Sequence, residues 1–434
     1  MAISDPSGST FTPVVTDTIK STQDSRKSPL PVGWEYAYAY VFFVAMFLGQ
    51  TVRFFVSSEP LIGAQPAQIL IPLVAFLISV ALWLVSPVPI RLPSGLLAIF
   101  FGLLIFIWLW ALIRDWGATD LTAFTLGPFL AMLAAKTPTL ACALRILNTL
   151  GVLVLFLFAS AAVFAIITDA PPTGFTTKWP PLTDTFDPIG MWWAPFNGPA
   201  EAGAIGAVLI VLGFGQRKWL SIPFVIGGGV ILFYAGTLAA ALGLGVALLI
   251  LLLGYARTSL HKRTIQLAAA AVALMGLLVL IQELVRNPTL SSRTFIWSDF
   301  VALVRTNPIW GWGSAALIES EATRTFPWGE ARTAHGSDAH NLWFDAWTRY
   351  GIGGFVLACA ATIVAILLAI RGYKRGAVLG AALVGMVYAV GMTEHNIWWG
   401  APGTSSSVFV LSIFLTSNSA SSRISGDLER DDIH

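Results

Sequence analysis

Long runs of apolar residues alternate with short polar stretches along most of the chain. Each run approaches the ~20 residues that an α-helix needs to cross a bilayer, and none shows the alternating pattern of an outer-membrane β-strand. The pattern predicts about twelve transmembrane helices, at 34–54, 61–85, 94–113, 118–135, 142–168, 197–214, 219–235, 238–255, 264–285, 342–370, 377–394 and 401–417. We therefore expect an all-α polytopic membrane protein.

The composition excludes several other classes of protein. Of the 434 residues, 56% are hydrophobic and only 11% are charged, with a mean hydropathy of +0.76. Soluble domains carry roughly 25% charged residues, and disordered chains need still more polar composition. The net charge of +2 is too small for a nucleic-acid-binding protein. Cys142 and Cys359 both lie inside apolar runs and predict neither a disulfide framework nor a zinc site.

Basic residues predict the orientation of the twelve spans. With this number of spans, the basic clusters between helices fall on one side, which the positive-inside rule makes cytoplasmic. They are Lys20, Arg26, Lys27, Arg91, Lys136, Arg145, Arg217, Lys218, Arg257, Lys262, Arg263, Arg371, Lys374, Arg375 and Arg423. We expect a disordered cytoplasmic tail at 1–33, a transmembrane domain at 34–417 and a cytoplasmic tail at 418–434.

Two long loops then lie on the outer side, at 169–196 and at 286–341, between helices nine and ten. The second loop is rich in basic side chains, on the side where such residues are normally scarce. It contains Arg286, Arg293, Arg305, Arg324, Arg332, His335 and His340. This exception predicts an anionic ligand in the loop.

The stretch from Ser291 to Val304 predicts an amphipathic helix along the membrane surface, with its aromatic residues at headgroup depth. Serines stand at its expected N-cap, and Asn307-Pro308 predicts its end. The start of a helix favours anions, and Arg293 would add bidentate donors for phosphate oxygens. The alternative is that Arg293 reaches ordinary lipid phosphates.

The sequence immediately before helix ten contains two histidines, His335 and His340, followed by Asn341. An imidazole at the membrane face can act as a general base at neutral pH, and Asn341 could orient it or hold a substrate hydroxyl. Asp338 could complete a metal site with the histidines, but no further ligand has familiar spacing. We expect no metal. A histidine that merely caps helix ten is the remaining alternative.

Other polar residues stand near the outer ends of predicted helices, where ionisable groups suggest function. They are Glu59, Arg114, Asp115, Asn197, Glu201, Glu394, His395 and Asn396. The chain has no Walker loop and no Asp-x-Asp motif in an outer loop, and Gly311-Trp312-Gly313 is best interpreted as a tight turn. Group transfer outside the cytoplasm needs a donor that is already activated, such as a lipid-linked pyrophosphate.

Four motifs carry a resemblance to a known family. Arg293-x3-Trp297, Asn307-Pro308-Ile309-Trp310-Gly311-Trp312-Gly313, His340-Asn341 and Tyr350-Gly351-Ile352-Gly353-Gly354 resemble the O-antigen ligase/polymerase superfamily of the Wzy_C type. Within it, the chain is most similar to exopolysaccharide polymerases of the ExoQ type. The motifs cover roughly residues 290–355.

The resemblance implies a GT-C-related glycosyltransferase in the bacterial inner membrane, with its catalytic loop at 286–341 in the periplasm. It implies a metal-independent, inverting enzyme without cofactor that transfers or polymerises undecaprenyl-pyrophosphate-linked oligosaccharides for surface polysaccharides such as exopolysaccharide or O-antigen. The expected partners are this donor, a glycan acceptor and membrane lipids, with a chain-length regulator or a flippase as further candidates. No nucleic acid is expected.

The resemblance also implies roles for particular residues. Arg293 would bind the pyrophosphate and His340 would activate the acceptor hydroxyl, with Asn341 and His335 as further catalytic candidates. Candidate substrate-binding residues are Arg332, Arg305, Arg324, Trp297, Asn197, Glu201 and His395. Many relatives carry a Ser-Arg pair where this chain has Gly236-Thr237-Leu238, so a second pyrophosphate arginine would come from Arg332, Arg305 or Arg324.

Two other functions remain open at the level of sequence. One is a ligase that joins glycan to lipid A core or another terminal acceptor. The other is a transporter or flippase for lipid-linked oligosaccharide, although such a protein has little need of a large polar loop with arginines and histidines on one side.

Overall fold

We describe the fold from a computed structural model. It describes residues 34–56, 65–93, 95–114, 121–168, 199–215, 218–235, 237–256, 293–313, 318, 320–321, 339–392, 394 and 404–417. Within these ranges the chain is helical and contains no strand.

Helices occupy eleven of the twelve predicted spans. They are α1 (Ala37–Val56), α2 (Gln65–Val85), α3 (Gly95–Arg114), α4 (Leu121–Ala135), α5 (Leu140–Thr168), α6 (Pro199–Phe214), α7 (Lys218–Ala235), α8 (Leu238–Tyr255), α13 (Leu342–Lys374), α14 (Val378–Gly391) and α15 (Thr404–Ser417). The predicted ninth span, 264–285, lies outside the described residues, as do most of the loop at 286–341 and the predicted tails. The all-helical class is therefore confirmed for the described part of the chain.

Four of the described helical segments are long and apolar enough to cross a membrane by length and composition. They are Gly95–Ile113, Leu140–Val163, Leu238–Tyr255 and Leu342–Lys374. The other apolar segments are shorter, so the number of membrane crossings remains a prediction.

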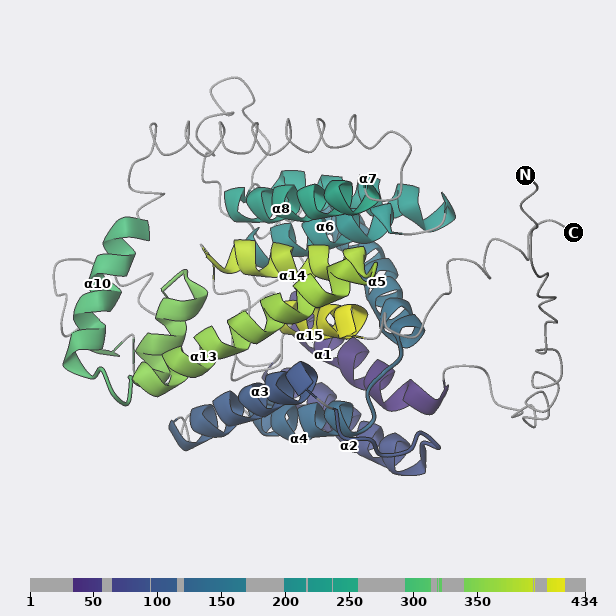
Figure 1. The fold of residues 1–434 in the computed structure, drawn as a ribbon. Helices are drawn as coiled ribbons and strands as arrows, with labels where there is room; N and C mark the ends of the chain where they lie inside the picture. The colour runs from purple at the N-terminus through teal and green to yellow at the C-terminus, as the bar shows by residue number, and fades with distance from the viewer. Residues whose placement is uncertain are drawn as a thin grey trace, which may run out of the picture. The chain divides into compact units, whose positions relative to one another are not determined.

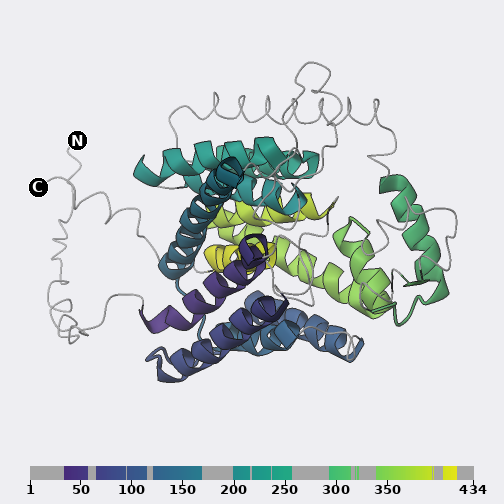
Figure 2. The same cartoon turned by 180° about the vertical axis from the view of Figure 1, so that it is seen from behind.

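The helices pack in two groups around a buried central helix (Figures 1 and 2). Helices α1 to α4 form one group, in which α1 contacts α2 and α4 contacts both α2 and α3; α6, α7, α8 and α14 form the other. Helix α15 contacts α5, α13 and α14, and its residues from Val408 to Leu415 are all buried. Helix α13 connects the two groups, because it contacts α3 as well as α14 and α15.

Helix α13 is broken at Gly351, where φ is 66° and ψ is −166°. The indole Nε1 of Trp343 donates to the hydroxyl of Thr362 at 3.2 Å, and the rings of Trp347 and Phe355 lie 5.1 Å apart. An unbroken helix would separate Trp343 from Thr362 by about 28 Å. The prediction of one continuous span at 342–370 was therefore wrong: residues 342–350, the entry segment, fold back along residues 352–374, the spanning segment (Figure 1).

The break also resolves a problem of length. The whole of α13, 33 residues, would measure about 50 Å as a straight helix, far more than the ~30 Å hydrocarbon core of a bilayer. The spanning segment alone is about 34 Å long, which matches one crossing.

Backbone groups that the break exposes find partners outside the helix. A helix ends with carbonyl groups that have no intrahelical donor, and such groups must be satisfied when they are buried. The carbonyl of Thr348 accepts from Trp312 N at 2.7 Å, and that of Arg349 accepts from Gly313 N at 2.8 Å. The indole of Trp110, on α3, donates to the carbonyl of Tyr350 at 2.7 Å. Three consecutive carbonyls of the entry segment are thus satisfied.

The segment 307–313, which we call the lock loop, contacts the break directly. On the other side of Gly351, Ile352 N donates to the carbonyl of Pro308 at 2.9 Å. The side chain of Asn307 donates to the carbonyl of Gly311 at 2.6 Å, which holds the loop in a tight turn. Both Gly311 and Gly313 have positive φ, at 69° and 79°, so the predicted turn at this motif is confirmed.

Glycine is required at Gly351 for both conformation and space. Its φ of 66° favours glycine, and a Cβ there would lie 2.0 Å from the carbonyl oxygen of Ile309. Gly353 is a matched control on the same helix, because a Cβ there would lie no closer than 3.6 Å to its neighbour, the Trp110 ring.

We predict that Gly351→Ala destabilises the protein by more than about 2 kcal/mol, since the strained backbone alone costs about 1–3 kcal/mol and the overlap with Ile309 adds to it. Gly353→Ala should stay close to the unmodified protein. The difference is measured as the thermal unfolding midpoint of each variant in detergent. Size-exclusion chromatography after heating reports how much folded protein remains. Equal midpoints for the two variants would contradict the requirement for glycine where Gly351 contacts the lock loop.

Candidate functional site

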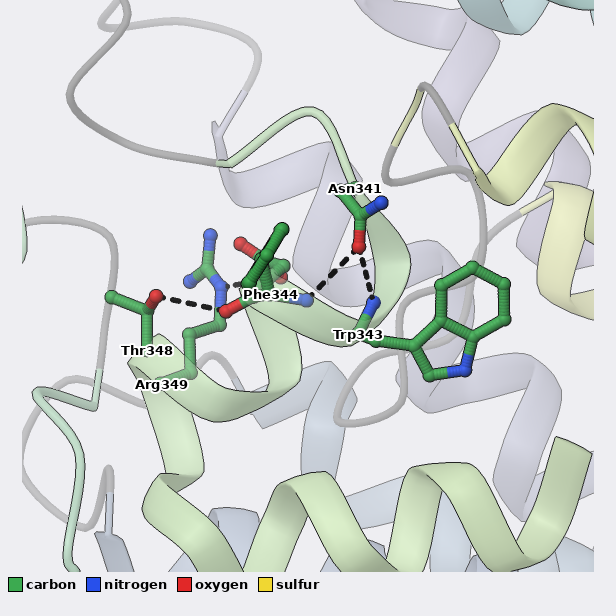
Figure 3. Close-up of polar contacts among 6 residues, drawn as sticks. Asn341, Trp343, Phe344, Thr348 and Arg349 are labelled. Carbon is green, nitrogen blue, oxygen red and sulfur yellow. Dashed lines mark hydrogen bonds and ion pairs between the residues drawn. The ribbon is translucent and has the colours of Figure 1, made fainter. Parts of the chain in front are cut away.

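The side chain of Asn341 holds the start of the entry segment in place (Figure 3). Asn341 has the extended backbone of an N-cap, and its Oδ1 accepts from the backbone N–H groups of Trp343 and Phe344, each at 3.1 Å. Its Nδ2 donates to the carbonyl of Met392, just beyond α14, at 2.9 Å. Both ends of this amide are therefore used to join two helix ends, a positioning role that sequence reasoning left open beside a substrate contact.

His340 precedes this cap and contacts a carboxylate. Its Nδ1 lies 3.1 Å from Oε2 of Glu394, with 25% of the histidine side chain exposed and only 7% of the glutamate side chain. His340 also has a φ of 44°, which is uncommon for a residue with a side chain. Such conformations persist where the surroundings hold them and are often found at functional sites.

Glu394 owes its position to the packing of three helix ends. Its backbone N–H donates to the carbonyl of Val390 at 3.0 Å, one turn earlier. Val390 packs in a small core with Ala204 near the start of α6 and Ala239 near the start of α8. The carboxylate thus stands where α14 ends and α6 and α8 begin.

Only a weak signal in the sequence points to this pairing. Glu394 is one of several polar residues near predicted helix ends, and it is not among the site residues that the sequence predicts. The two partners are 54 positions apart in the sequence, so no local pattern reveals the contact. The available signal was an acidic residue at the outer end of an apolar helix.

An imidazole beside a carboxylate can accept a proton at its other nitrogen. A carboxylate that accepts the Nδ1–H fixes the tautomer in which Nε2 carries the lone pair. The same negative charge stabilises the imidazolium that forms when Nε2 takes a proton. The arrangement is therefore chemically suited to general-base catalysis.

Trp297 lies beside His340 through the backbone of the neighbouring residue. It belongs to α10 (Arg293–Thr306), the helix that the sequence predicted in the outer loop. Its indole Nε1 donates to the carbonyl of Ala339 at 3.0 Å, so the ring supports the loop that carries His340. Arg293 begins α10, one turn before Trp297; its side chain lies outside the described residues.

The apolar side of α10 is covered by protein. Phe300 and Leu303 are buried in a small core with Ile318 and Ala339, and Trp312 and Phe344 pack against it. Helix α10 also contacts α13. This apolar side therefore packs on protein, which hydrophobic periodicity cannot distinguish from a side that packs on lipid. The depth of α10 in the membrane stays a prediction.

Arg349 is a buried arginine of the entry segment. Its Nε donates to Oδ2 of Asp345 at 2.9 Å, one turn away on the same helix (Figure 3), and only 3% of its side chain is exposed. A buried charge needs a paired partner, and Asp345 supplies it. The pairing compensates the buried charge of Arg349, and its burial keeps Arg349 away from a ligand in the surrounding solvent.

Two more candidate substrate-binding residues are described. Arg305 is exposed in the last turn of α10, about 12 Å of helix rise beyond Trp297, so it is not brought next to His340. Glu201 is half-buried in the first turn of α6, one turn before Ala204, and therefore at the same helix ends as Glu394. Candidates that lie outside the described residues are Asn197, Arg324, Arg332, His335 and His395.

The position where many relatives carry Ser-Arg is occupied by the start of α8. Thr237 has an extended backbone at the N-cap, and its side chain makes no capping hydrogen bond. A Cβ at Gly203, on α6, would lie 2.1 Å from the Thr237 hydroxyl, so α6 and α8 approach closely here. The space beside Thr237 is thus taken up by helix packing.

The described residues contain no group of three or more His, Cys, Asp or Glu side chains that could hold a metal ion. His340 and Glu394 would supply two ligands, whereas a catalytic zinc site usually has three protein ligands.

A comparison with protein families matches residues 222–359 to the model of the Wzy_C family, described as O-antigen ligase. The match runs from α7 to the spanning segment of α13 and confirms the resemblance to the O-antigen ligase/polymerase superfamily; it does not distinguish the ExoQ type. No curated protein matches the chain. The match covers less than half of the chain; together with the apolar helices it is in keeping with a multi-pass membrane protein that resembles this superfamily.

We predict that Asn341→Ala lowers the stability of the folded protein by about 1 kcal/mol or more, the usual effect of losing an N-cap, and that Asn341→Ser recovers most of it. Serine can cap the helix but cannot donate an amide hydrogen to Met392. Thermal midpoints of the two variants, together with glycan-transfer rates, separate the two roles: a serine variant with a normal midpoint and reduced transfer would show that the Met392 contact serves activity. If neither variant changed the midpoint, the capping role would be wrong.

Proposed function

We propose that this protein is a bacterial inner-membrane glycosyltransferase that polymerises undecaprenyl-pyrophosphate-linked oligosaccharide repeat units at the periplasmic face. The observation that carries the proposal is the contact between His340 and Glu394, with His340 next to α10 and within the segment that matches the O-antigen ligase family. In this proposal both termini are cytoplasmic, in keeping with the distribution of basic residues.

The proposed reaction begins with a proton transfer. Nε2 of His340 takes the proton of an acceptor sugar hydroxyl while Glu394 stabilises the resulting imidazolium. The acceptor oxygen forms a bond to C1 of the donor sugar as the bond from C1 to the pyrophosphate oxygen breaks, with both electrons leaving on that oxygen. Attack from the face opposite to the leaving group inverts the configuration at C1. The proton is then released from His340 to solvent.

Negative charge develops on the pyrophosphate during this step. Arg293, together with N–H groups at the start of α10, is proposed to stabilise it, because helix starts and guanidinium groups both favour phosphate oxygens. The second arginine is proposed to be Arg324 or Arg332, since Arg305 stands at the other end of α10. Such charge stabilisation needs no metal ion and no nucleotide.

The site residues test this chemistry directly. We predict that His340→Ala lowers the transfer rate by about 10²–10⁴-fold, the usual contribution of a general base, without loss of membrane abundance or donor binding. Glu394→Gln should lower the rate by about 10- to 100-fold, as expected for loss of one charge-assisted hydrogen bond, and Glu394→Asp should retain more activity because it keeps the charge. Full activity in the His340 variant would exclude it as the base.

A ligase that transfers glycan to lipid A core or another terminal acceptor is the second candidate, because the matched family is described as O-antigen ligase. A transporter or flippase is the third candidate, but it has little need of a large polar loop with arginines and histidines on one side.

Product lengths distinguish the three functions. We predict that the purified protein in proteoliposomes converts a lipid-linked oligosaccharide into a ladder of longer lipid-linked chains, seen on a gel and by mass spectrometry. A single product formed only when a separate acceptor is added would favour the ligase. Movement of the substrate across the bilayer without any new glycosidic bond would favour the transporter and contradict the proposed reaction.

A further inference from the structure

The lock loop presents two large apolar side chains away from the protein. Ile309 is 59% exposed and Trp310 is 55% exposed, although the backbone of the same loop is tightly packed against the break in α13. The Trp310 ring stacks on the ring of Trp110, with centroids 5.7 Å apart and planes at 11°. These apolar side chains are thus held outward on a rigid loop.

The same apolar surface continues along the spanning segment. Ile352, Val356, Ile363 and Ile370 are all exposed, and their spacing places them on one side of the helix. Pro308, at the start of the loop, accepts a hydrogen bond from Ile352 N. The exposed tip of the lock loop therefore stands at one end of the exposed apolar stripe of α13.

The length of that stripe gives the depth of the loop in a membrane. Arg371, Lys374 and Arg375 mark its other end, where basic side chains reach the water boundary. From Arg371 back to Ile352 the helix rises about 29 Å, close to the ~30 Å thickness of the hydrocarbon core. The lock loop consequently reaches the opposite boundary, where tryptophan is enriched in membrane proteins.

We propose that Ile309 and Trp310 form an anchor that inserts among the headgroups and upper acyl chains of the leaflet on the His340 side. The occupant of this surface is phospholipid, because the surface is apolar, continues the stripe of a membrane-crossing segment and lies one bilayer thickness from the basic residues. In this proposal the anchor makes the membrane contact that the sequence analysis predicts for the aromatic residues of α10. The anchor proposal depends on the spanning segment of α13 crossing the membrane, and it does not depend on the proposed glycan-transfer reaction.

The anchor has a consequence for the entry segment. The lock loop is bonded to the entry segment through Thr348 and Arg349, and that segment begins at the cap beside His340. The depth of the loop in the leaflet therefore fixes the depth of the entry segment, whose start contacts Thr362 of the spanning segment.

Collision measurements on spin labels test the anchor. In proteoliposomes of a Cys142→Ser, Cys359→Ser background, single cysteines at Ile309, Ser298 and Ile363 are labelled and their collision rates with oxygen and with a water-soluble nickel chelate are compared. Ser298 is an exposed position on α10, and Ile363 is exposed in the middle of the spanning segment. We expect the label at 309 to favour oxygen over nickel, with a ratio between those at 363 and 298. A label at 309 as accessible to nickel as the label at 298 would overturn the proposal.

A photocrosslinker provides a second measurement if the cysteine variant at Ile309 does not fold. Replacement of Trp310 by p-benzoylphenylalanine keeps an aromatic ring at the stack with Trp110. We expect phospholipid adducts by mass spectrometry after irradiation; adducts only to a second copy of the chain, or none to lipid, would contradict the anchor. Neither readout involves glycan transfer, so an anchored protein without transferase activity would contradict the proposed reaction alone.

Discussion

The satisfaction of backbone hydrogen bonds at the break in α13 is the constraint on which the rest of this site depends. A helix that reverses at Gly351 leaves the carbonyls of Thr348, Arg349 and Tyr350 without intrahelical donors, and three groups outside the helix supply them. In or near a bilayer, where water cannot take over this task, each unsatisfied group would cost several kcal/mol. The reversal is therefore possible only where the lock loop and α3 meet the helix, and this fixes the direction of the entry segment.

The entry segment in turn brings its N-terminus to the end of α14. Three contacts follow one another along this junction: His340 with Glu394, Asn341 with the carbonyl of Met392, and the stacked rings of Trp343 and Tyr388. The last two contacts hold the entry segment and the end of α14 together, so the first is formed with little further loss of conformational freedom. Preorganisation of this kind is what a base needs if the imidazole is to keep one orientation throughout a reaction.

Several features of this arrangement could be predicted from the sequence because they depend on local patterns. Long apolar runs predicted eleven helices near their observed positions, and Asn307-Pro308 predicted the end of α10. The break in α13 could not be predicted in this way, since Tyr350-Gly351-Ile352 lies within an apolar run that is compatible with a continuous helix. Only the tertiary contact with Ile309 and Gly311 makes a positive φ at Gly351 favourable. The partnership of His340 with Glu394 escaped prediction for the same reason, because two separate helix ends create it.

The residues of the motifs that carry the family resemblance have two different structural roles. Asn307 holds the turn of the lock loop, and Gly311 and Gly313 lie against the backbone of α13 at Gly351 and Arg349. His340 forms the carboxylate contact, and Asn341 caps the helix that follows. Since the lock recognises only main-chain atoms, it constrains the position of a reacting group and carries no information about a sugar. In the proposed reaction, the choice of sugar and acceptor would then depend on side chains other than those of the lock. A chain can therefore share the lock and the proposed base with another and still build a different polysaccharide, so the resemblance bears on the architecture and the class of reaction more than on the product.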